Sequence, residues 1–362
     1  MRGLSALLFA VLLPGWAAAG DVPSMRVDPF WPKPLPHNWI LGQVAGVATD
    51  ANDHVWIIQR PGSLTPDEKG AALTPPRSKC CIPAPPVIEF DAAGTVVRAW
   101  GGPKIDKGGK GYDWVSNEHG IYIDPKGFVW IGGNGDNDGQ ILKFTRDGKF
   151  VLQIGHPATG AASNDTTRLG RPADTRLDPA TNELYVADGY ANHRIIVFDA
   201  DTGAYKRHWG AYGHRPVDEK LHYDPKAAPA QQFGNPVHCV KLANDGLVYV
   251  CDRQNDRIQV FKKDGTFVTE WFMEKETRGA GSVWDLALWP DARQTILFNA
   301  DGENNEVRLI KRADGTVLGA FGRSGRQAGQ FHWVHNLAID SKGNLFTTEV
   351  DNAKRVQKFV PN

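Results

Sequence analysis

One unit of four short segments, separated by turns, recurs along most of this chain. It is clearest over residues 235–271, and the same unit is found at 118–155 and 171–210. Weaker copies start near Val44, Val283 and Val334. Each segment alternates β-branched or aromatic residues with polar ones and is bounded by Asp-Gly, Asn-Asp-Gly or Lys-Gly turns, which is typical of antiparallel strands. Six such sheets must stack radially to bury both faces, so we predict an all-β, six-bladed β-propeller.

Aromatic residues at one position of the repeat indicate how the sheets pack. Phenylalanine recurs at the end of the third strand and is expected in the core between blades, at Phe90, Phe144, Phe198, Phe261 and Phe359. The last copy stops after its third strand, so we expect residues 25–31 to supply the strand that completes it. Three insertions interrupt the repeat and are expected to be loops that could wall a substrate site, at 61–86, 104–113 and 211–232.

Residues 1–20 have the pattern of a secretory signal peptide. Met1-Arg2 precede an apolar run over residues 4–13 and the small residues 17–20. We therefore expect residues 21–362 to form one exported domain, secreted or periplasmic. Lysine plus arginine and aspartate plus glutamate both total 41, which gives no net field to attract nucleic acid or an anionic membrane. We expect a monomer that acts on a small-molecule or peptide substrate.

The four cysteines fall into two close pairs in a chain expected to be exported. Cys239 and Cys251 lie symmetrically about the turn Asn244-Asp245-Gly246, so they could bond across a hairpin or remain two packed thiols. Cys80 and Cys81 lie in a proline-rich insertion and could form a vicinal bridge or stay reduced. The sequence does not choose between these alternatives.

Three histidines occupy equivalent positions in alternate copies of the repeat. The position lies five residues before the end of the first strand, and it holds His119, His238 and His335 in the second, fourth and sixth copies. The other copies hold Ala45, Ala173 and, by approximate alignment, Trp284. Alternate blades of a six-fold ring lie about 120° apart, so the three imidazoles should meet at the channel mouth. Three histidines with a fourth position open are typical of a catalytic zinc, and we expect Zn²⁺ there.

The remaining histidines show no such pattern. We interpret them as surface or loop residues: His37, His54, His156, His193, His208, His214, His222 and His332.

A tyrosine and two arginines are predicted beside the histidines. Because the first two strands of a blade are antiparallel, the end of the second lies beside the start of the first. Arg60, Tyr190 and Arg253 follow second strands. Two flanking cations would favour the phenolate of Tyr190, which makes it a candidate base, and a guanidinium can bind a carboxylate through two hydrogen bonds. We take these three residues as candidate catalytic residues.

These segments resemble those of the peptidyl-α-hydroxyglycine α-amidating lyases, which are propellers of NHL-type repeats. The family's zinc histidines lie in His-Gly-Leu, Pro-His-Ser-Leu and Pro-His-Asp-Ile segments, and the segments around His119, His238 and His335 are similar. Its catalytic tyrosine lies in Ser-Asp-Gly-Tyr, matched by residues 187–190. Arg253, and more loosely Arg60, match its two active-site arginines. The resemblance covers nearly all of residues 21–362 and implies a zinc lyase.

The chain departs from the family at several positions. Trp333 replaces a methionine, Ala191 replaces a cysteine, and Asn336 replaces an aspartate that helps to hold a structural Ca²⁺ in the family. The chain also has no copper monooxygenase domain to make the lyase substrate. The resemblance therefore implies zinc and the fold more firmly than it implies the substrate or a calcium ion.

Three functions follow from this sequence. The first is a zinc lyase that cleaves the N–C bond of a carbinolamide such as peptidyl-α-hydroxyglycine, giving an amide and glyoxylate. The second is a zinc hydrolase or hydratase acting on another small substrate. The third is a non-catalytic NHL binding propeller, because a fold alone does not decide function.

Overall fold

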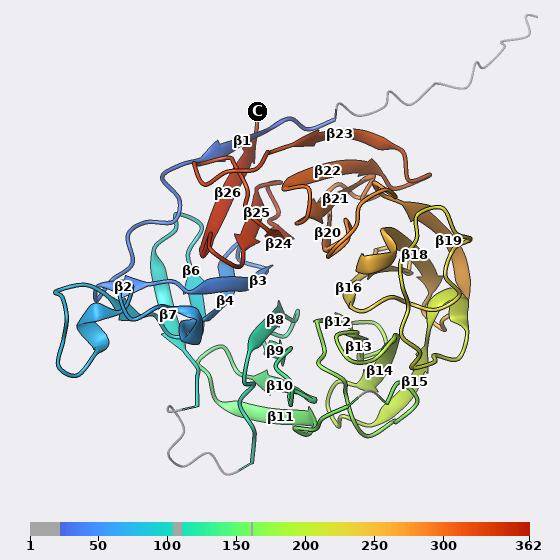
Figure 1. The fold of residues 1–362 in the computed structure, drawn as a ribbon, viewed down its shortest axis with the longest axis horizontal. Helices are drawn as coiled ribbons and strands as arrows, with labels where there is room; N and C mark the ends of the chain where they lie inside the picture. Colours follow the sequence, from blue (N-terminus) through green and yellow to red (C-terminus); the bar gives the residue numbers. More distant parts are fainter. Residues whose placement is uncertain (1–21, 104–110, 161) are drawn as a thin grey trace, which may run out of the picture.

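The computed structural model describes residues 22–103, 111–160 and 162–362. Six four-stranded antiparallel sheets surround one axis, and the strand that begins each copy of the repeat lies nearest that axis (Figure 1). The first three blades contain β3 (Gln43–Thr49), β4 (Val55–Arg60), β6 (Val87–Phe90) and β7 (Val96–Trp100); β8 (Glu118–Ile123), β9 (Val129–Gly133), β10 (Gln140–Phe144) and β11 (Phe150–Gly155); and β12 (Asp174–Asp178), β13 (Glu183–Asp188), β14 (Arg194–Asp199) and β15 (Tyr205–Trp209).

The last three blades repeat the same arrangement. They contain β16 (Val237–Leu242), β17 (Leu247–Asp252), β18 (Arg257–Lys262) and β19 (Phe267–Phe272); β20 (Asp285–Leu288), β21 (Ile296–Asp301), β22 (Glu306–Lys311) and β23 (Val317–Phe321); and β24 (Val334–Ile339), β25 (Leu345–Glu349), β26 (Arg355–Pro361) and β1 (Met25–Asp28). The predicted six-bladed β-propeller is thus confirmed.

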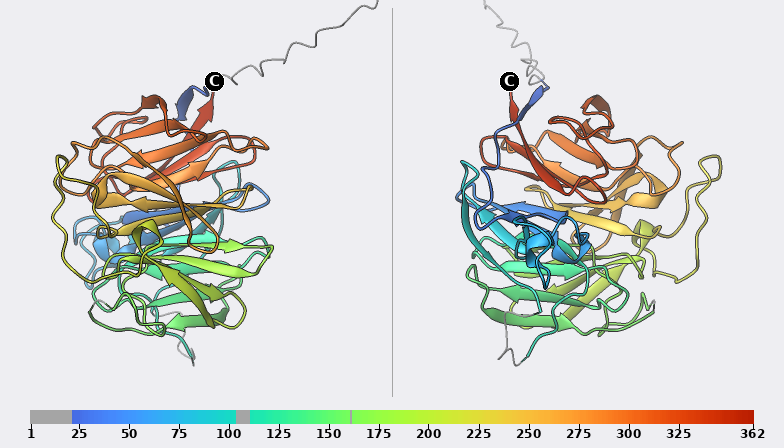
Figure 2. Two further views of the ribbon diagram at one scale, coloured as in Figure 1. Left: turned by 90° about the vertical axis from the view of Figure 1, so that its right-hand side faces the viewer. Right: turned by 60° about the vertical axis from the view of Figure 1, so that its left-hand side comes forward.

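The two ends of the described chain meet in the sixth blade. Strand β1 pairs antiparallel with β26, from Met25 opposite Pro361 to Asp28 opposite Lys358. Figure 2 shows these two segments side by side at the edge of the ring. Trp31 follows β1 and is buried between the first and sixth blades, with its ring 5.5 Å from Phe90 and 4.9 Å from Phe346. Strand pairing and aromatic packing therefore both close the ring.

The recurring phenylalanines lie in the core, as the sequence predicts. All five are at most 4% exposed. Phe144 of the second blade, for example, packs its ring 5.2 Å from Trp100 of the first. Burial of a large apolar side chain contributes about 1.5–3 kcal/mol, so this stripe is a main source of cohesion between blades.

The insertion over residues 61–86 projects from the first blade and is anchored at its end. Its strand β5 (Ile82–Pro83) pairs in parallel with β2 (Trp39–Ile40). Disulfides link Cys80 to Cys81 in this insertion and Cys239 to Cys251 between β16 and β17. The proposed signal peptide, and most of the insertion at 104–113, lie outside the described residues. A helix with the length and hydropathy needed to cross a bilayer is not found in the described part of the chain.

Candidate metal centre

Irregularities in the first strands turn the three histidines toward the axis. In β16 the pairing passes from Val237 to Cys239, and in β24 it passes from Val334 to Asn336, so His238 and His335 are left unpaired between them. In β8 the same irregularity includes His119. A β-bulge of this kind re-aims a side chain that regular pleating would direct at a neighbouring sheet.

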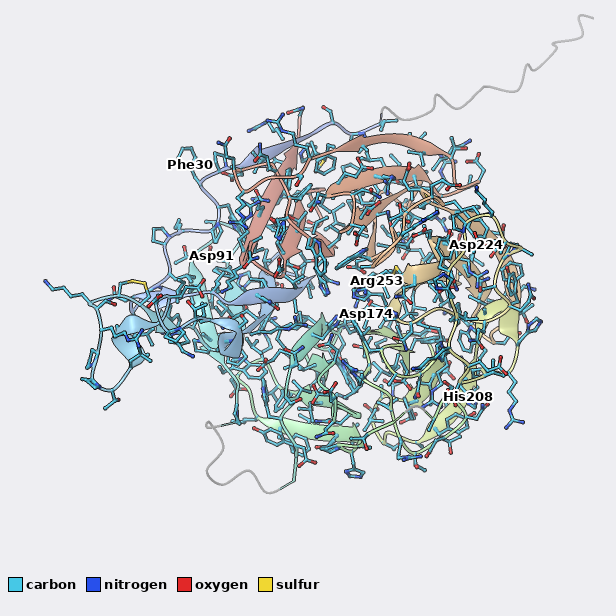
Figure 3. All side chains as sticks on the ribbon, in the orientation of Figure 1. Phe30, Asp91, Asp174, His208, Asp224 and Arg253 are labelled. Carbon is cyan, nitrogen blue, oxygen red and sulfur yellow. A yellow bond between two sulfur atoms is a disulfide. The ribbon has the colours of Figure 1, made fainter. Side chains whose placement is uncertain are left out.

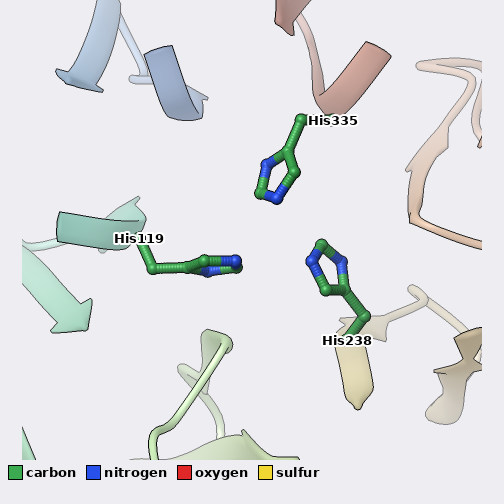
Figure 4. Close-up of side chains that lie close together, drawn as sticks. All are labelled: His119, His238 and His335. Atoms are coloured by element: carbon green, nitrogen blue, oxygen red, sulfur yellow. The ribbon is translucent and has the colours of Figure 1, made fainter. Parts of the chain in front are cut away.

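The three imidazoles converge, as Figure 4 shows. The ring centroids of His119 and His238 are 5.0 Å apart, and each lies 4.8 Å from that of His335. One ring nitrogen from each histidine lies within 4.8 Å of the other two, and all three side chains are buried. This nearly equilateral group could hold a metal ion.

Backbone carbonyls of the intervening blades orient the three rings. The Nδ1 atoms of His119 and His335 lie 2.9 Å and 2.6 Å from the carbonyl oxygens of Ala173 and Ala45, and Nδ1 of His238 contacts that of Trp284. These three carbonyls belong to the repeat position that holds histidine in the other blades. Each Nδ1–H therefore donates to the next blade, and each Nε2 lone pair is left for a ligand.

The surroundings keep these imidazoles neutral. Burial, followed by the nearby Arg60 charge, lowers the pKa of His119 well below its usual value. Burial and Arg253 do the same for the pKa of His238, and burial and His119 do so for that of His335. Neutral imidazoles are the form that binds a metal ion, so the site needs little change in protonation to accept one.

Tyr190 lies at the open side of the three histidines. Its Oη atom is 2.9 Å from Nε2 of His119 and 3.0 Å from Nε2 of His238. The preceding Gly189 lets the loop after β13 approach this closely, because a Cβ there would lie 2.1 Å from the carbonyl oxygen of Val237. The tyrosine predicted to share the face of the histidines is thus next to two of them.

Arg253 is a desolvated cation beside this tyrosine. Its Nη1 atom is 3.4 Å from Tyr190 Oη, and its guanidinium lies 4.3 Å from the ring centroid of Trp284. Its Nε atom is buried without a hydrogen-bond partner. Burial lowers the pKa of Arg253, and the neighbouring Tyr190 opposes this shift. The guanidinium therefore retains donors for an anionic ligand.

Arg60 lies in the opposite blade and is held differently. Its Nε, Nη1 and Nη2 atoms donate to the Glu118 carbonyl at 2.7 Å, to Gln43 Oε1 at 2.8 Å and to Asn134 Oδ1 at 3.2 Å. The structure thus brings both predicted arginines to the histidine face, but only Arg253 has a nitrogen without a protein acceptor.

Charged side chains in the layer below the histidines pair with one another. Lys241 Nζ lies 2.9 Å from Asp174 Oδ2 and 2.6 Å from Asp285 Oδ1, close to the centre of the ring, where Figure 3 labels Asp174. Asn336 Oδ1 accepts the Val47 N–H at 2.9 Å. Lys241 and Arg176, whose Nη1 atom lies 2.7 Å from Asp174 Oδ1, together balance these two carboxylates. The Asn336 oxygen is already engaged, so the residues here do not fit the Ca²⁺ that the family resemblance suggested.

Trp333, the departure beside the last histidine, forms part of the rim. Its backbone is left-handed, with φ of 52°, and its side chain is 38% exposed. The ring centroid lies 5.4 Å from that of Trp284. A bulky residue seldom adopts this conformation, so the fold holds this indole at the rim despite a local cost.

The other histidines stay apart from the centre, and one of them, His193, is buried. His193 lies in the loop before β14, but it is only 7% exposed, and its Nδ1 bonds the carbonyl of Phe233 at 2.9 Å. His193 is thus a loop residue, one of the two alternatives that the sequence left open, and the loop is buried at this point.

Comparisons with known proteins agree with this architecture. The NHL repeat family model matches residues 169–198. NHL repeat-containing protein 3 of Homo sapiens is 27% identical over 354 residues, which cover 93% of this chain and 84% of that protein. A probable peptidyl-α-hydroxyglycine α-amidating lyase of Caenorhabditis elegans is 28% identical over 324 residues, which cover 87% of this chain and 81% of that protein. The solved structure of a streptogramin B lyase, 12% identical with a TM-score of 0.52, covers 93% of this chain and 98% of that one and shows a shared fold alone. The chain is therefore an NHL-repeat propeller with similarity to α-amidating lyases.

Proposed function

We propose that this protein is a zinc-dependent lyase that cleaves the N–C bond of a carbinolamide such as a peptidyl-α-hydroxyglycine, releasing an amide and glyoxylate. The observation that carries the proposal is the set of three neutral imidazoles whose Nε2 atoms face one point, with Tyr190 and Arg253 beside them. The similarity to a probable α-amidating lyase supports this choice of reaction.

The donor set suits zinc. His119, His238 and His335 provide three imidazole nitrogens and leave one position open, as in catalytic zinc sites. Each ring is fixed by a carbonyl bond through Nδ1, the usual support of a ligating histidine. A bound Zn²⁺ would supply Lewis-acid polarisation of the substrate's hydroxyl or carboxylate oxygen.

Tyr190 is the proposed base. Its Oη atom accepts the proton of the substrate's hydroxyl while the C–N bond breaks and the C–O bond becomes a carbonyl. The same proton then passes to the departing amide nitrogen, so the reaction consumes no water and no other reactant. A phenol close to both His119 and His238 is near enough to the proposed ion to reach a substrate held there.

Arg253 is the proposed site for the substrate's carboxylate. Arg253 is desolvated, and its Nε atom has no hydrogen-bond partner. The adjacent carboxylate of Asp252 pairs with Arg257 and not with Arg253. A carboxylate bound here would gain charge-assisted hydrogen bonds that the protein leaves unmade. Arg60 adds positive charge, but its three nitrogens already donate to protein acceptors. It therefore contributes mainly to the positive electrostatic potential around the centre.

The proposal is tested by metal content and turnover of the purified protein. We expect about one zinc per chain by elemental mass spectrometry, and release of glyoxylate from α-hydroxyhippurate. His238→Ala should lose both. His193→Ala is the matched control, since it removes a buried histidine that also bonds a backbone carbonyl. Zinc without carbinolamide cleavage, but with ester hydrolysis, would support a hydrolase instead, and no metal in any preparation would leave a binding propeller.

We also propose that residues 1–20 direct export and that residues 21–362 act as one secreted or periplasmic domain. The two disulfides are compatible with an oxidising compartment.

A further inference from the structure

A large cavity adjoins the metal centre between the first and second blades. Its volume is about 1180 Å³, and residues from both blades and from the 61–86 insertion line it. Arg60 and Glu118 lie in its wall, and Glu118 directly precedes His119 in β8. The cavity therefore lies beside the histidine face, on the side of Arg60, although none of the three histidines lines it.

The polar side chains in this wall are largely engaged by the protein. Gln43 Oε1 accepts from Arg60, and Ser63 Oγ accepts the Gln43 N–H and donates to the Arg60 carbonyl. Asn117 Nδ2 donates to Asn134 Oδ1 at 2.6 Å. Because these groups already have partners, the wall offers few hydrogen bonds to a ligand and favours an apolar one.

Apolar groups make up much of the remaining surface. Trp114, Val115 and several prolines and glycines line the cavity. Trp114 is fixed there, because its Nε1–H donates to Glu118 Oε1 at 2.9 Å and its ring lies against Gly101, where a Cβ would come within 2.7 Å of the indole. A rigid aromatic side chain in an apolar wall provides contact area at a low entropic cost.

The positions of the two arginines indicate how a substrate would be oriented in the site. Arg253 directly follows β17, the second strand of the fourth blade, and Arg60 ends β4, the second strand of the first. These two blades face each other across the six-bladed ring (Figure 1), so the arginines approach the histidines from opposite sides. A carboxylate bound by Arg253 leaves the acylamino part of the substrate to extend toward Arg60 and the cavity beyond it.

We propose that this cavity is the binding subsite for the apolar acyl group of an N-acyl-α-hydroxyglycine, an inference that rests on the proposed lyase function. The enzyme thereby prefers substrates whose amide carries a bulky aromatic or aliphatic group. Two other cavities, which share Leu221, lie on the side of Arg253, and a third is lined by residues of the six first strands, Lys241 among them. In this proposal the acyl group uses none of these three.

Two variants should disturb the subsite in different ways. Gly62 lines the cavity, and a Cβ there meets no atom within 4 Å, so Gly62→Trp adds bulk without forcing the backbone. Trp114→Ala removes the aromatic contact. Gly319→Trp is the matched control because Gly319, in β23, has equally open surroundings far from the cavity. Leu221→Ala tests the cavities on the other side.

The kinetic experiment compares N-acetyl-, N-benzoyl- and N-octanoyl-α-hydroxyglycine by glyoxylate release. We expect kcat/KM to be at least about tenfold higher for the two bulky substrates, and both cavity variants to lose most of that preference while acetyl turnover changes less than about twofold. Comparison of the benzoyl and octanoyl substrates shows which kind of acyl group the subsite prefers. Equal effects on acetyl and bulky substrates, or a loss of preference in Leu221→Ala alone, would overturn the subsite but leave the lyase intact.

A binding measurement keeps the subsite testable if none of the substrates is cleaved. Octanamide and benzamide, the corresponding amide products, are titrated into the purified protein and followed by ligand-observed NMR. We expect binding that Gly62→Trp abolishes and Gly319→Trp preserves. If the amides bind neither the original protein nor the control, or bind all variants equally, the subsite is wrong whatever the outcome for catalysis.

Discussion

Nδ1 of His335 lies 2.6 Å from the carbonyl oxygen of Ala45, across the junction between the last blade and the first. The two residues are far apart in sequence, and only closure of the ring brings them together. One of the three converging imidazole rings is therefore oriented by the same junction that β1 and Trp31 close. This arrangement couples the stability of the ring to the geometry of the centre.

Trp31→Ala should weaken both stability and metal binding. The side chain is 5% exposed between Phe90 and Phe346, so its loss should cost about 3 kcal/mol of unfolding free energy. Because the junction loosens, zinc affinity should fall as well, measured by competition with a chelator. Phe30→Ala is the control, since Phe30 is 86% exposed. Unchanged zinc affinity in a clearly destabilised Trp31→Ala protein would show that the junction and the centre are independent.

The sequence predicts the fold and the histidine set well because both follow from repetition. A position counted from the end of each first strand identifies His119, His238 and His335 without any knowledge of contacts, and the antiparallel pairing of strands places Tyr190 and Arg253 near them. These predictions need only the period of the repeat and the direction of the strands.

The parts that could not be predicted involve the backbone or a neighbouring blade. Ala45, Ala173 and Trp284 hold the rings through carbonyl oxygens, which every residue type has, so no side chain marks that role. The β-bulges that aim the rings are likewise invisible in the residue pattern. Lys241 looks like a solvated lysine in a strand until the ring brings Asp174 and Asp285 to its ammonium.

Tyr190→Phe should separate catalysis from metal binding. The variant loses the proposed base but none of the three imidazoles, so kcat should fall by a factor of about 10² or more while zinc content stays near that of the original protein. Glyoxylate release and elemental analysis on the same preparation give both values. Full turnover by Tyr190→Phe would remove this residue from the mechanism.

Arg253→Gln should impair recognition of the substrate's carboxylate. We expect KM to rise by a factor of about 10 to 100, since a charge-assisted hydrogen bond contributes about 1.5–3 kcal/mol. A substrate in which a carboxamide replaces the carboxylate should be poor for the original protein and hardly affected further by the variant. Arg60→Gln, which removes a charge and breaks bonds to Gln43 and Asn134, should discriminate between the two substrates much less than Arg253→Gln does, because Arg60 acts on the carboxylate only through the field. If Arg60→Gln alone discriminated between them, the carboxylate would bind on the other side of the ring.

Asp256 should make stability depend on pH. Burial, together with the nearby Asp301 carboxylate, raises its pKa to about 7 despite hydrogen bonds from Ser282 and Tyr223. A raised pKa means that the folded protein holds this proton more tightly than the unfolded chain, so the stabilisation is complete below the ordinary aspartate pKa and is lost as pH rises through 7.

Asp256→Asn tests that dependence. It removes the charge and keeps a side chain that tolerates the left-handed backbone at this position, where φ is 50°. Urea unfolding should show nearly equal stability of the two proteins at pH 4. At pH 8 the variant should be more stable by about 2 kcal/mol, because one pKa unit corresponds to about 1.4 kcal/mol and solvent screens part of the shift. A variant that is less stable than the original protein at pH 8 would mean that the ionised carboxylate is favourable in the fold, for instance through its bond from the Ser282 N–H.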